Sequence, residues 1–239
     1  MHPYTETLEA GITFTMCPVA GGSFMMGGDE YENEKPKHRV ELTDFYMCEH
    51  PVTQAVWECV MDSNPSYHKG PVRPVEQVSW NDAQEFIKKL NAWGKTHPNS
   101  SRPSGNYCLP TEAQWEYAAR GGQQSEGFIY AGSNKLEEVG YYNRNNAGVT
   151  RPVGQLYANE LGLYDMSGNV WEWCLDWYSE DYYKNSPAQN PHGPETGSGR
   201  VLRGGSWRSI AQSCRVADRN FNPPDIRLSS IGFRIVFVP

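Results

Sequence analysis

The sequence predicts an irregular α+β fold with little regular secondary structure. Short alternations of apolar and polar residues, typical of strands, occur near both ends of the chain, and three helices with recognisable caps fall between residues 53 and 121. Between residues 122 and 200, glycine, asparagine, proline and aromatic residues dominate without a clear period. We therefore expect tertiary packing or a metal ion, rather than intrinsic propensity, to order that region.

Length and composition favour one domain over residues 1–239, because no Ser/Gly linker or charge run divides the chain. With 8 Trp and 14 Tyr, large aromatic side chains can anchor a core inside a loop-rich body. The net charge of −7 and the lack of a basic stripe argue against nucleic acid as the partner. No apolar run is long enough to span a membrane, and residues 1–6 lack the features of a signal peptide. We expect a cytoplasmic protein by default, with display on a cell surface or virion as the alternative.

The six cysteines are scattered without a CxxC pair. In a chain of this length, that spacing predicts buried free thiols rather than a disulfide framework or a zinc site. The histidines form no HExxH motif, so the sequence gives no support to a zinc peptidase.

The first half of the chain contains strand and helix signals in order. Ile12, Phe14 and Met16 alternate with threonines, 24–26 is a second apolar run, and 39–48 is expected to form one strand. Three helices follow, each with a polar N-cap. Thr53 caps the first, which should stop at Asn64-Pro65, Ser79 with Asp82 begins the second, and Thr111 with Gln114 forms a capping box for the third.

The end of the chain again shows strand patterns. Residues 200–207 predict a strand entering a tight turn, and 231–238 predict one final alternating strand. Between them, 208–230 is a polar loop interrupted by Ile210, Phe221, Ile226 and Leu228. These four side chains follow neither helix nor strand spacing. Either they are exposed and form a binding patch, or they pack inward as anchors of the loop.

Residues 162–173 are too rich in Gly, Asn and Asp for a helix and too apolar for a mobile loop. Two carboxylates, of Asp165 and Glu172, stand close to flexible carbonyls at Gly168 and Val170. Oxygen-only donors of this kind suit a hard cation such as Ca²⁺. The alternative is a turn in which Asp165 caps local amides and Glu172 meets an arginine.

Seven short motifs, taken together, closely resemble the formylglycine-generating enzyme (sulfatase-modifying factor) family. They occur in the family's order and cover nearly the whole chain: GSFMMG at 22–27, PVT at 51–53, PVEQVSW at 74–80, LPTEAQWE at 109–116, GNVWEW at 168–173, RGGSW at 203–207 and IGFR at 231–234. The resemblance implies an irregular α+β variant of the C-type lectin fold with adjacent termini. It also implies one Ca²⁺ held by Asp165, Gly168, Val170 and Glu172. A second family calcium site would fall at 143–153, where this chain has no acidic residue.

The family's oxidase activity, which converts a sulfatase cysteine to formylglycine, resembles copper-thiolate chemistry with two cysteines five residues apart. Cu(I) prefers two thiolate ligands, and here the corresponding segment holds only Cys214. We therefore expect no copper and no catalytic residue, with Cys214 as a buried thiol beneath the loop.

The C-terminal segment resembles the variable region of diversity-generating retroelement target proteins, which display a diversified surface on this scaffold. The resemblance implies a framework of Trp207, Cys214, Arg215, Val216, Ala217, Arg219, Pro224, Asp225, Arg227 and Gly232. The implied ligand-binding positions are Arg208, Ser209, Ile210, Ala211, Ser213, Asn220, Phe221, Asn222, Ile226, Leu228, Ser229 and Ser230.

The leading hypothesis is thus a non-catalytic binding module whose ligand is an unidentified protein or glycan. One alternative is an enzyme of the formylglycine-generating type or an accessory protein in sulfatase maturation. Another is a structural subunit that recruits partners.

Overall fold

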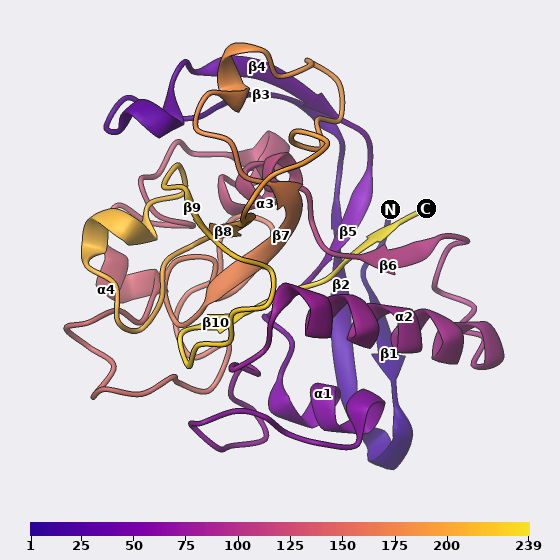
Figure 1. Cartoon of the computed structure of the whole chain (residues 1–239). Helices are drawn as coiled ribbons and strands as arrows, with labels where there is room; N and C mark the ends of the chain where they lie inside the picture. The colour runs from indigo at the N-terminus through magenta and orange to yellow at the C-terminus, as the bar shows by residue number, and fades with distance from the viewer.

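The structure, a computed structural model, describes all residues from 1 to 239. The two ends of the chain meet in one five-stranded antiparallel sheet with the order β1-β2-β5-β11-β6. Its strands are β1 (Tyr4–Thr7), β2 (Thr13–Val19), β5 (Phe45–Cys48), β6 (Asn106–Cys108) and β11 (Val236–Val238). The N- and C-termini therefore lie side by side (Figure 1).

Two helices pack beside this sheet, α1 (Gln54–Met61) and α2 (Trp80–Thr96). Their predicted caps are confirmed: Thr53 accepts from the Val56 amide, and Ser79 forms a capping box with Asp82. In the core between them, the Trp57 ring stacks on Phe86 at a centroid distance of 5.4 Å. The first helix ends earlier than expected, because Asp62 adopts a left-handed conformation that closes it at Met61.

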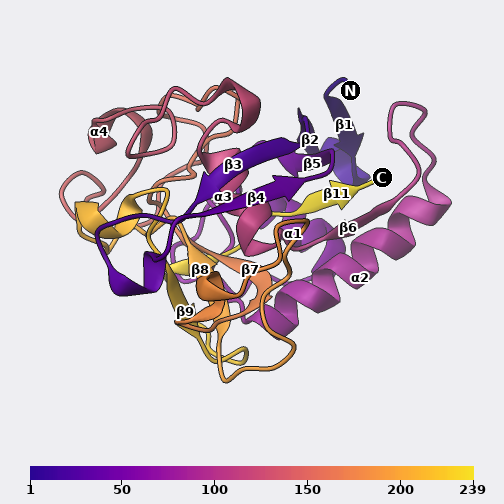
Figure 2. The ribbon, with the colours of Figure 1, turned by 90° about the horizontal axis from the view of Figure 1, so that it is seen from above.

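A second sheet, with the order β10-β7-β8-β9, occupies the other half of the molecule. Its strands are β7 (Trp171–Trp177), β8 (Arg200–Arg203), β9 (Asn220–Asn222) and β10 (Ile231–Gly232). Helix α3 (Glu112–Ala119) contacts this sheet, and the ribbon of β3 (Gly22–Met26) and β4 (His38–Leu42) lies over α3 (Figure 2). The capping box predicted for α3 is confirmed.

Three sequence predictions about strands are corrected. Residues 39–48 form two strands in different sheets, because the chain bends at 43–44, where Thr43 and Asp44 bond to Asn190 and Gly21. The expected final strand, 231–238, is likewise divided between β10 and β11. Strand β7 lies within the region expected to lack periodicity. Most of its residues are buried whichever way they point, so no alternation marks it in the sequence.

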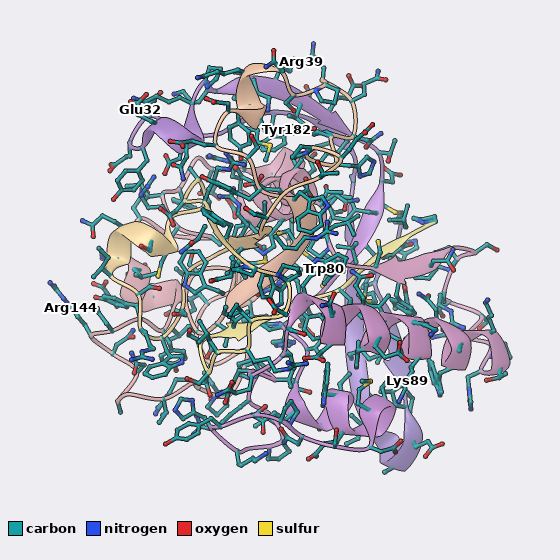
Figure 3. The ribbon with its side chains drawn as sticks, in the orientation of Figure 1. Glu32, Arg39, Trp80, Lys89, Arg144 and Tyr182 are labelled. Carbon is teal, nitrogen blue, oxygen red and sulfur yellow. The ribbon has the colours of Figure 1, made fainter.

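The remaining elements are short. They are α4 (Leu136–Val139) and the 3-10 helices η1 (Glu9–Gly11), η2 (Glu32–Glu34), η3 (Gly122–Gln124), η4 (Tyr182–Lys184) and η5 (Ala211–Cys214). Lys89 on α2 and Arg144 beyond α4 extend outward at the surface (Figure 3). None of the helices is both long and apolar enough to cross a bilayer. The predicted α+β architecture with few regular elements is confirmed.

Candidate functional site

The segment that follows β8 is folded tightly onto α3. Gly204 and Gly205 have φ values of +92° and +74°, in the left-handed region that favours glycine. A Cβ on Gly204 would lie 2.9 Å from the Trp115 ring, and one on Gly205 would lie 2.6 Å from Cys214 Sγ. The predicted tight turn is thus present, and its two glycines allow 206–219 to pack directly on the core.

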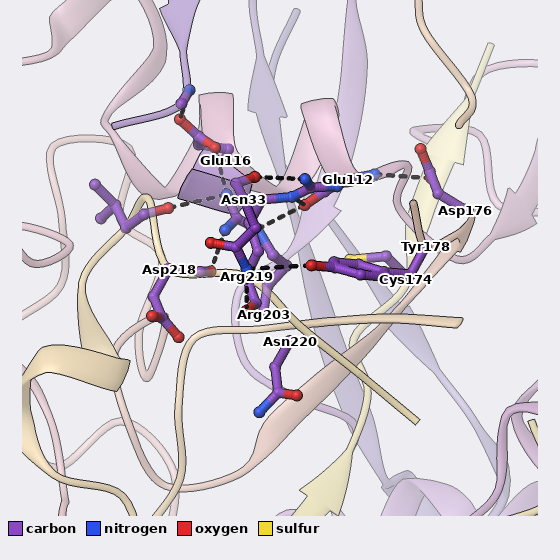
Figure 4. Close-up of polar contacts among 12 residues, drawn as sticks. Asn33, Glu112, Glu116, Cys174, Asp176, Tyr178, Arg203, Asp218, Arg219 and Asn220 are labelled. Carbon is purple, nitrogen blue, oxygen red and sulfur yellow. Dashed lines mark hydrogen bonds and ion pairs between the residues drawn. The ribbon is translucent and has the colours of Figure 1, made fainter. Parts of the chain in front are cut away.

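Buried arginines hold this segment from beneath (Figure 4). Arg219 donates from Nε and Nη2 to the two oxygens of Glu112 at 2.7 and 2.9 Å. Arg203, fully buried, contacts the Glu116 carboxylate and donates to the main-chain oxygens of Val216 and Asp218. Burial opposes ionisation of Glu116, but Arg120 and Arg203 hold its pKa below the usual value. We call Arg203, Arg219, Glu112 and Glu116 the buried ion-pair network.

A further pair fixes the segment to η2. Arg215 donates to both oxygens of Glu34, at 2.6 and 3.2 Å, and the Glu34 side chain is fully buried. The sequence placed Arg215 and Arg219 in the framework but did not reveal their partners Glu34 and Glu112, nor Glu116, the partner of Arg203. The only sequence signal was the capping box of the helix that carries Glu112 and Glu116.

The apolar side chains of 208–230 were the critical test of a binding patch. Ile210, Phe221 and Leu228 are 55%, 44% and 45% exposed, as the patch requires, whereas Ile226 is half-buried. Phe221 also stacks on Tyr178 at a centroid distance of 4.3 Å and an interplanar angle of 16°, so one ring face is covered. Three exposed apolar side chains therefore project from a loop whose base is rigid.

The other predicted ligand-binding positions are either exposed or half-buried. Arg208 and Asn220 are exposed, and the rest are half-buried: Ser209, Ala211, Ser213, Asn222, Ser229 and Ser230. The Ser209 hydroxyl accepts from the Ser206 amide at 2.9 Å, and the Ser229 carbonyl accepts from Trp207 Nε1 at 2.9 Å. Such contacts order the loop, while Ile210, Phe221 and Leu228 stay exposed.

The framework positions are also mixed. Cys214, Val216, Ala217 and Gly232 are buried, Trp207 and Pro224 are half-buried, and Asp225 and Arg227 are exposed. Arg227 forms a bidentate pair with Asp82 at 2.7 Å, which ties the end of the loop to the first turn of α2. Most of the framework thus supports the loop from below, while Arg227 supports it from the side.

Both carboxylates predicted to hold calcium are buried, and Glu172 pairs with the buried Arg234. Glu172 accepts from Arg234 Nε and Nη2 at 2.6 and 2.7 Å and from Trp115 Nε1 at 2.7 Å. Asp165 accepts from the Gly154 amide at 2.8 Å and from Asn169 Nδ2 at 3.2 Å. These are the contacts of the turn that was the alternative to a metal site.

The same geometry leaves capacity for a cation. Arg234 pairs with Glu172, so Asp165 is a buried carboxylate without an ion pair, and burial raises its pKa to about 6. A carboxylate offers about four acceptor positions, of which Asp165 uses two. No group of three or more His, Cys, Asp or Glu side chains occurs, so a cation here would depend on the carbonyls of Gly168 and Val170. Charge and acceptor capacity for one Ca²⁺ thus rest on Asp165, and calcium binding by these four residues stays a prediction.

All six cysteines are free, as predicted. Cys214 is fully buried, and burial raises the pKa of its thiol to about 12. Since the thiolate is the form that binds metal or attacks a substrate, Cys214 is poorly suited to either role at neutral pH.

Comparisons with known proteins agree with this architecture. A family model described as the sulfatase-modifying factor enzyme 1-like domain matches residues 5–238. The chaperone protein LppX of Paenibacillus barcinonensis is 37% identical over 240 residues, covering 83% of this chain and 80% of that protein. The formylglycine-generating enzyme of Streptomyces coelicolor is 41% identical over 181 residues, covering 69% of this chain and 52% of the enzyme, so the match spans about half of that relative.

A solved structure, Treponema denticola variable protein 1, superposes with a TM-score of 0.90 at 32% identity, covering 99% of both chains. The predicted irregular C-type lectin-like fold is thereby confirmed.

Proposed function

Because this chain belongs to the sulfatase-modifying factor enzyme 1-like family, we propose that it uses the family scaffold for non-catalytic ligand binding, through a surface formed by 208–230. The exposure of Ile210, Phe221 and Leu228 carries this proposal. Fully burying such a side chain is worth about 1.5–3 kcal/mol, and the fold forgoes much of this gain at three positions of one loop. A bound ligand would recover it.

The similarity to Treponema denticola variable protein 1 over the whole chain supports a display role of the kind found in diversity-generating retroelement target proteins. A protein ligand is favoured over a glycan, because the relative that covers 83% of this chain is named a chaperone protein. The buried ion-pair network gives the loop a rigid base, which lowers the entropic cost of binding.

The experiment replaces Ile210, Phe221 and Leu228 together with serine. We expect ligand capture from a protein library to be lost while the free energy of unfolding changes little, because exposed side chains contribute little to stability. A matched control replaces Met25, Val72 and Tyr157, which are also exposed but lie outside the loop, and should keep capture intact. Unfolding of the loop variant, or equal loss of capture in the control, would contradict a binding role for this surface.

The second candidate is an oxidase or an accessory protein of sulfatase maturation, favoured by the identity to the Streptomyces enzyme. Incubation with a sulfatase-motif peptide, Cu(I) and oxygen distinguishes it, with mass spectrometry as the readout. We expect no aldehyde product, because the corresponding segment offers a single, buried thiol. An aldehyde that disappears in Cys214→Ser would establish the enzyme instead.

A further inference from the structure

A cavity of about 590 Å³ opens where η2, the end of β7 and the 213–221 segment meet. We call it the η2 cavity. Residues far apart in the sequence line it, including Tyr31, Tyr178, Glu180, Asp218 and Phe221. It therefore lies beside the proposed binding surface and shares Phe221 with it.

Three aromatic side chains, Tyr31, Tyr178 and Phe221, line the η2 cavity. Tyr178 stacks on Phe221, and the Arg219 guanidinium carbon lies 4.9 Å from the Tyr178 centroid. Tyr31 is 43% exposed and Phe221 is 44% exposed. The Arg215 guanidinium carbon lies 5.2 Å from the Tyr31 centroid and Tyr178 covers one face of Phe221, so each ring offers one face to a ligand. Exposed aromatic faces attract cations, and planar guanidinium groups stack on them especially well.

Three acidic side chains, Glu32, Glu180 and Asp218, line the η2 cavity together with one basic side chain, Arg219. Asp218 is 7% exposed, yet neither of its carboxylate oxygens forms a hydrogen bond. Its nearest cation is Arg215 at 3.6 Å, and Arg215 is already held by both oxygens of Glu34. In Figure 4 the Asp218 and Asn220 side chains point away from the buried ion-pair network.

The other charges at the cavity strengthen this imbalance. Glu180 is exposed and forms no ion pair, and Glu32 pairs only with the neighbouring Lys35. The single basic side chain in the lining, Arg219, is 5% exposed and neutralised by Glu112. A buried carboxylate that keeps free acceptor positions in a cavity also lined by aromatic rings is arranged for a cationic donor.

We propose that the η2 cavity binds the guanidinium group of an arginine side chain on the protein ligand. The ring of Phe221 or Tyr31 would stack on the guanidinium plane, and Asp218 with Glu180 would accept its N–H groups. A lysine ammonium suits the site less well, because it is compact, more strongly hydrated and unable to stack. This inference rests on the proposed function and names the chemistry of one part of the ligand.

The test titrates the full chain with Nα-acetyl-arginine amide, with chemical-shift changes of backbone amides as the readout. We expect saturable shifts centred on residues 31–33, 178–180 and 218–221. The neutral isostere Nα-acetyl-citrulline amide should not bind, and Nα-acetyl-lysine amide should bind several-fold more weakly. Binding of citrulline, or equal binding of lysine and arginine, would overturn the proposal.

Variants locate the contact. Asp218→Asn and Glu180→Gln should each weaken arginine binding roughly tenfold, the size expected for one charged hydrogen bond. Both should fold, because Glu180 is exposed and the one ion pair of Asp218 is a 3.6 Å contact with Arg215, which Glu34 still holds. Glu85→Gln on α2 serves as the charge control, and Tyr157→Leu serves as the control for Phe221→Leu. Unchanged binding in Asp218→Asn would refute the site. If arginine does not bind but serine substitution of Ile210, Phe221 and Leu228 still abolishes capture, only this inference fails.

Discussion

At the scale of single residues, Glu76 and His68 each have a buried polar atom without a hydrogen bond beneath the proposed binding surface. Glu76 is fully buried and accepts from the His68 amide at 2.6 Å, but its second oxygen has no partner. His68 Nδ1 also lacks a hydrogen bond and lies 3.7 Å from the same carboxylate. The His68 ring packs edge-on against Trp207, which links this pair to the base of the loop. A buried carboxylate with an unsatisfied oxygen is easier to accommodate when protonated.

Two buried carboxyls, Glu76 and Asp176, make the free energy of unfolding depend on pH. Burial raises the pKa of Glu76 to about 7 and that of Asp176 to about 8, above their unfolded values. In this range both carboxyls bind more protons in the folded state than in the unfolded state, so they lower the free energy of unfolding as pH rises from 6.5 to 8. The lowered pKa values of His50, about 4, and of His68 act in the opposite direction, mainly around and below the ordinary histidine pKa of 6.5.

We expect Glu76→Gln to remove about 1 kcal/mol of that fall, since glutamine stays neutral throughout. Thermal melts of both proteins at pH 6.5 and pH 8 measure it. Glu85→Gln, an exposed control, should retain the full slope. Parallel pH profiles for wild type and Glu76→Gln would show that Glu76 ionises normally in the fold.

At the scale of elements, the charges of residues 165–172 indicate which carboxylate a calcium ion would neutralise. Arg234 neutralises Glu172 and leaves Asp165 without an ion pair, so a bound Ca²⁺ would supply charge where the fold lacks it. If calcium binds only the native state, a hundredfold excess over Kd adds about 2.7 kcal/mol to the free energy of unfolding. We expect the melting temperature to be higher in millimolar CaCl2 than in EDTA, and Asp165→Ala to abolish the difference.

The control for calcium is Asp29→Ala, which removes an exposed carboxylate and should preserve the calcium response. Equal melting temperatures of the wild type in CaCl2 and in EDTA would assign the loop to its hydrogen bonds and to the Arg234 pair alone.

A helix or strand could be predicted when the contacts that determine it join residues close together in the sequence. The caps at Thr53, Ser79 and Thr111 involve groups three residues apart, so the sequence was enough to place all three helix starts. The division of 231–238 between two sheets could not be predicted, because it depends on pairing with distant strands. Strand β7 was missed for a different reason: its burial on both faces removed the alternation that marks a strand.

The candidate site likewise combines features that a local sequence pattern marks with features that depend on contacts between distant residues. The sequence singled out Ile210, Phe221, Ile226 and Leu228 as apolar residues without period in a polar loop, but it left open whether they are exposed or packed inward. The structure exposes three of them and half-buries Ile226. The partner of Arg215 lies 181 residues away at Glu34, and no local pattern connects them. The η2 cavity likewise depends on bringing residues 31–33 next to 218–221, which only the tertiary fold determines.

For the whole molecule, these observations indicate that the two sheets, with the helices beside them, have different roles. The five-stranded sheet with α1 and α2 joins the two termini, while α3 and the second sheet carry the buried ion-pair network beneath 208–230. Mutations in the base should therefore unfold the protein, whereas mutations in the exposed part of the loop should change binding alone. Such a separation is what a display scaffold requires.

Two arginines of similar geometry and different burial test this division. Arg219 and Arg227 each form a bidentate pair with one carboxylate, at 2.7–2.9 Å for the first and 2.7 Å for the second. The Arg219 side chain is 1% exposed and that of Arg227 is 52% exposed. We expect Arg219→Met to lower the free energy of unfolding by about 3–5 kcal/mol, because the buried Glu112 then keeps only the longer contact with Arg203 Nε at 3.7 Å. Arg227→Met should cost about 0–1 kcal/mol, since solvent screens an exposed pair.

The measurement is denaturant unfolding of both variants and of the double variant Glu112→Gln/Arg219→Met. The double variant should regain part of the lost stability, because the uncompensated charge is gone although the packing of Arg219 is still missing. Equal, small effects of the two single variants would mean that the network is not the base of the fold. A double variant as unstable as Arg219→Met would attribute the loss to packing around the guanidinium rather than to the unpaired carboxylate.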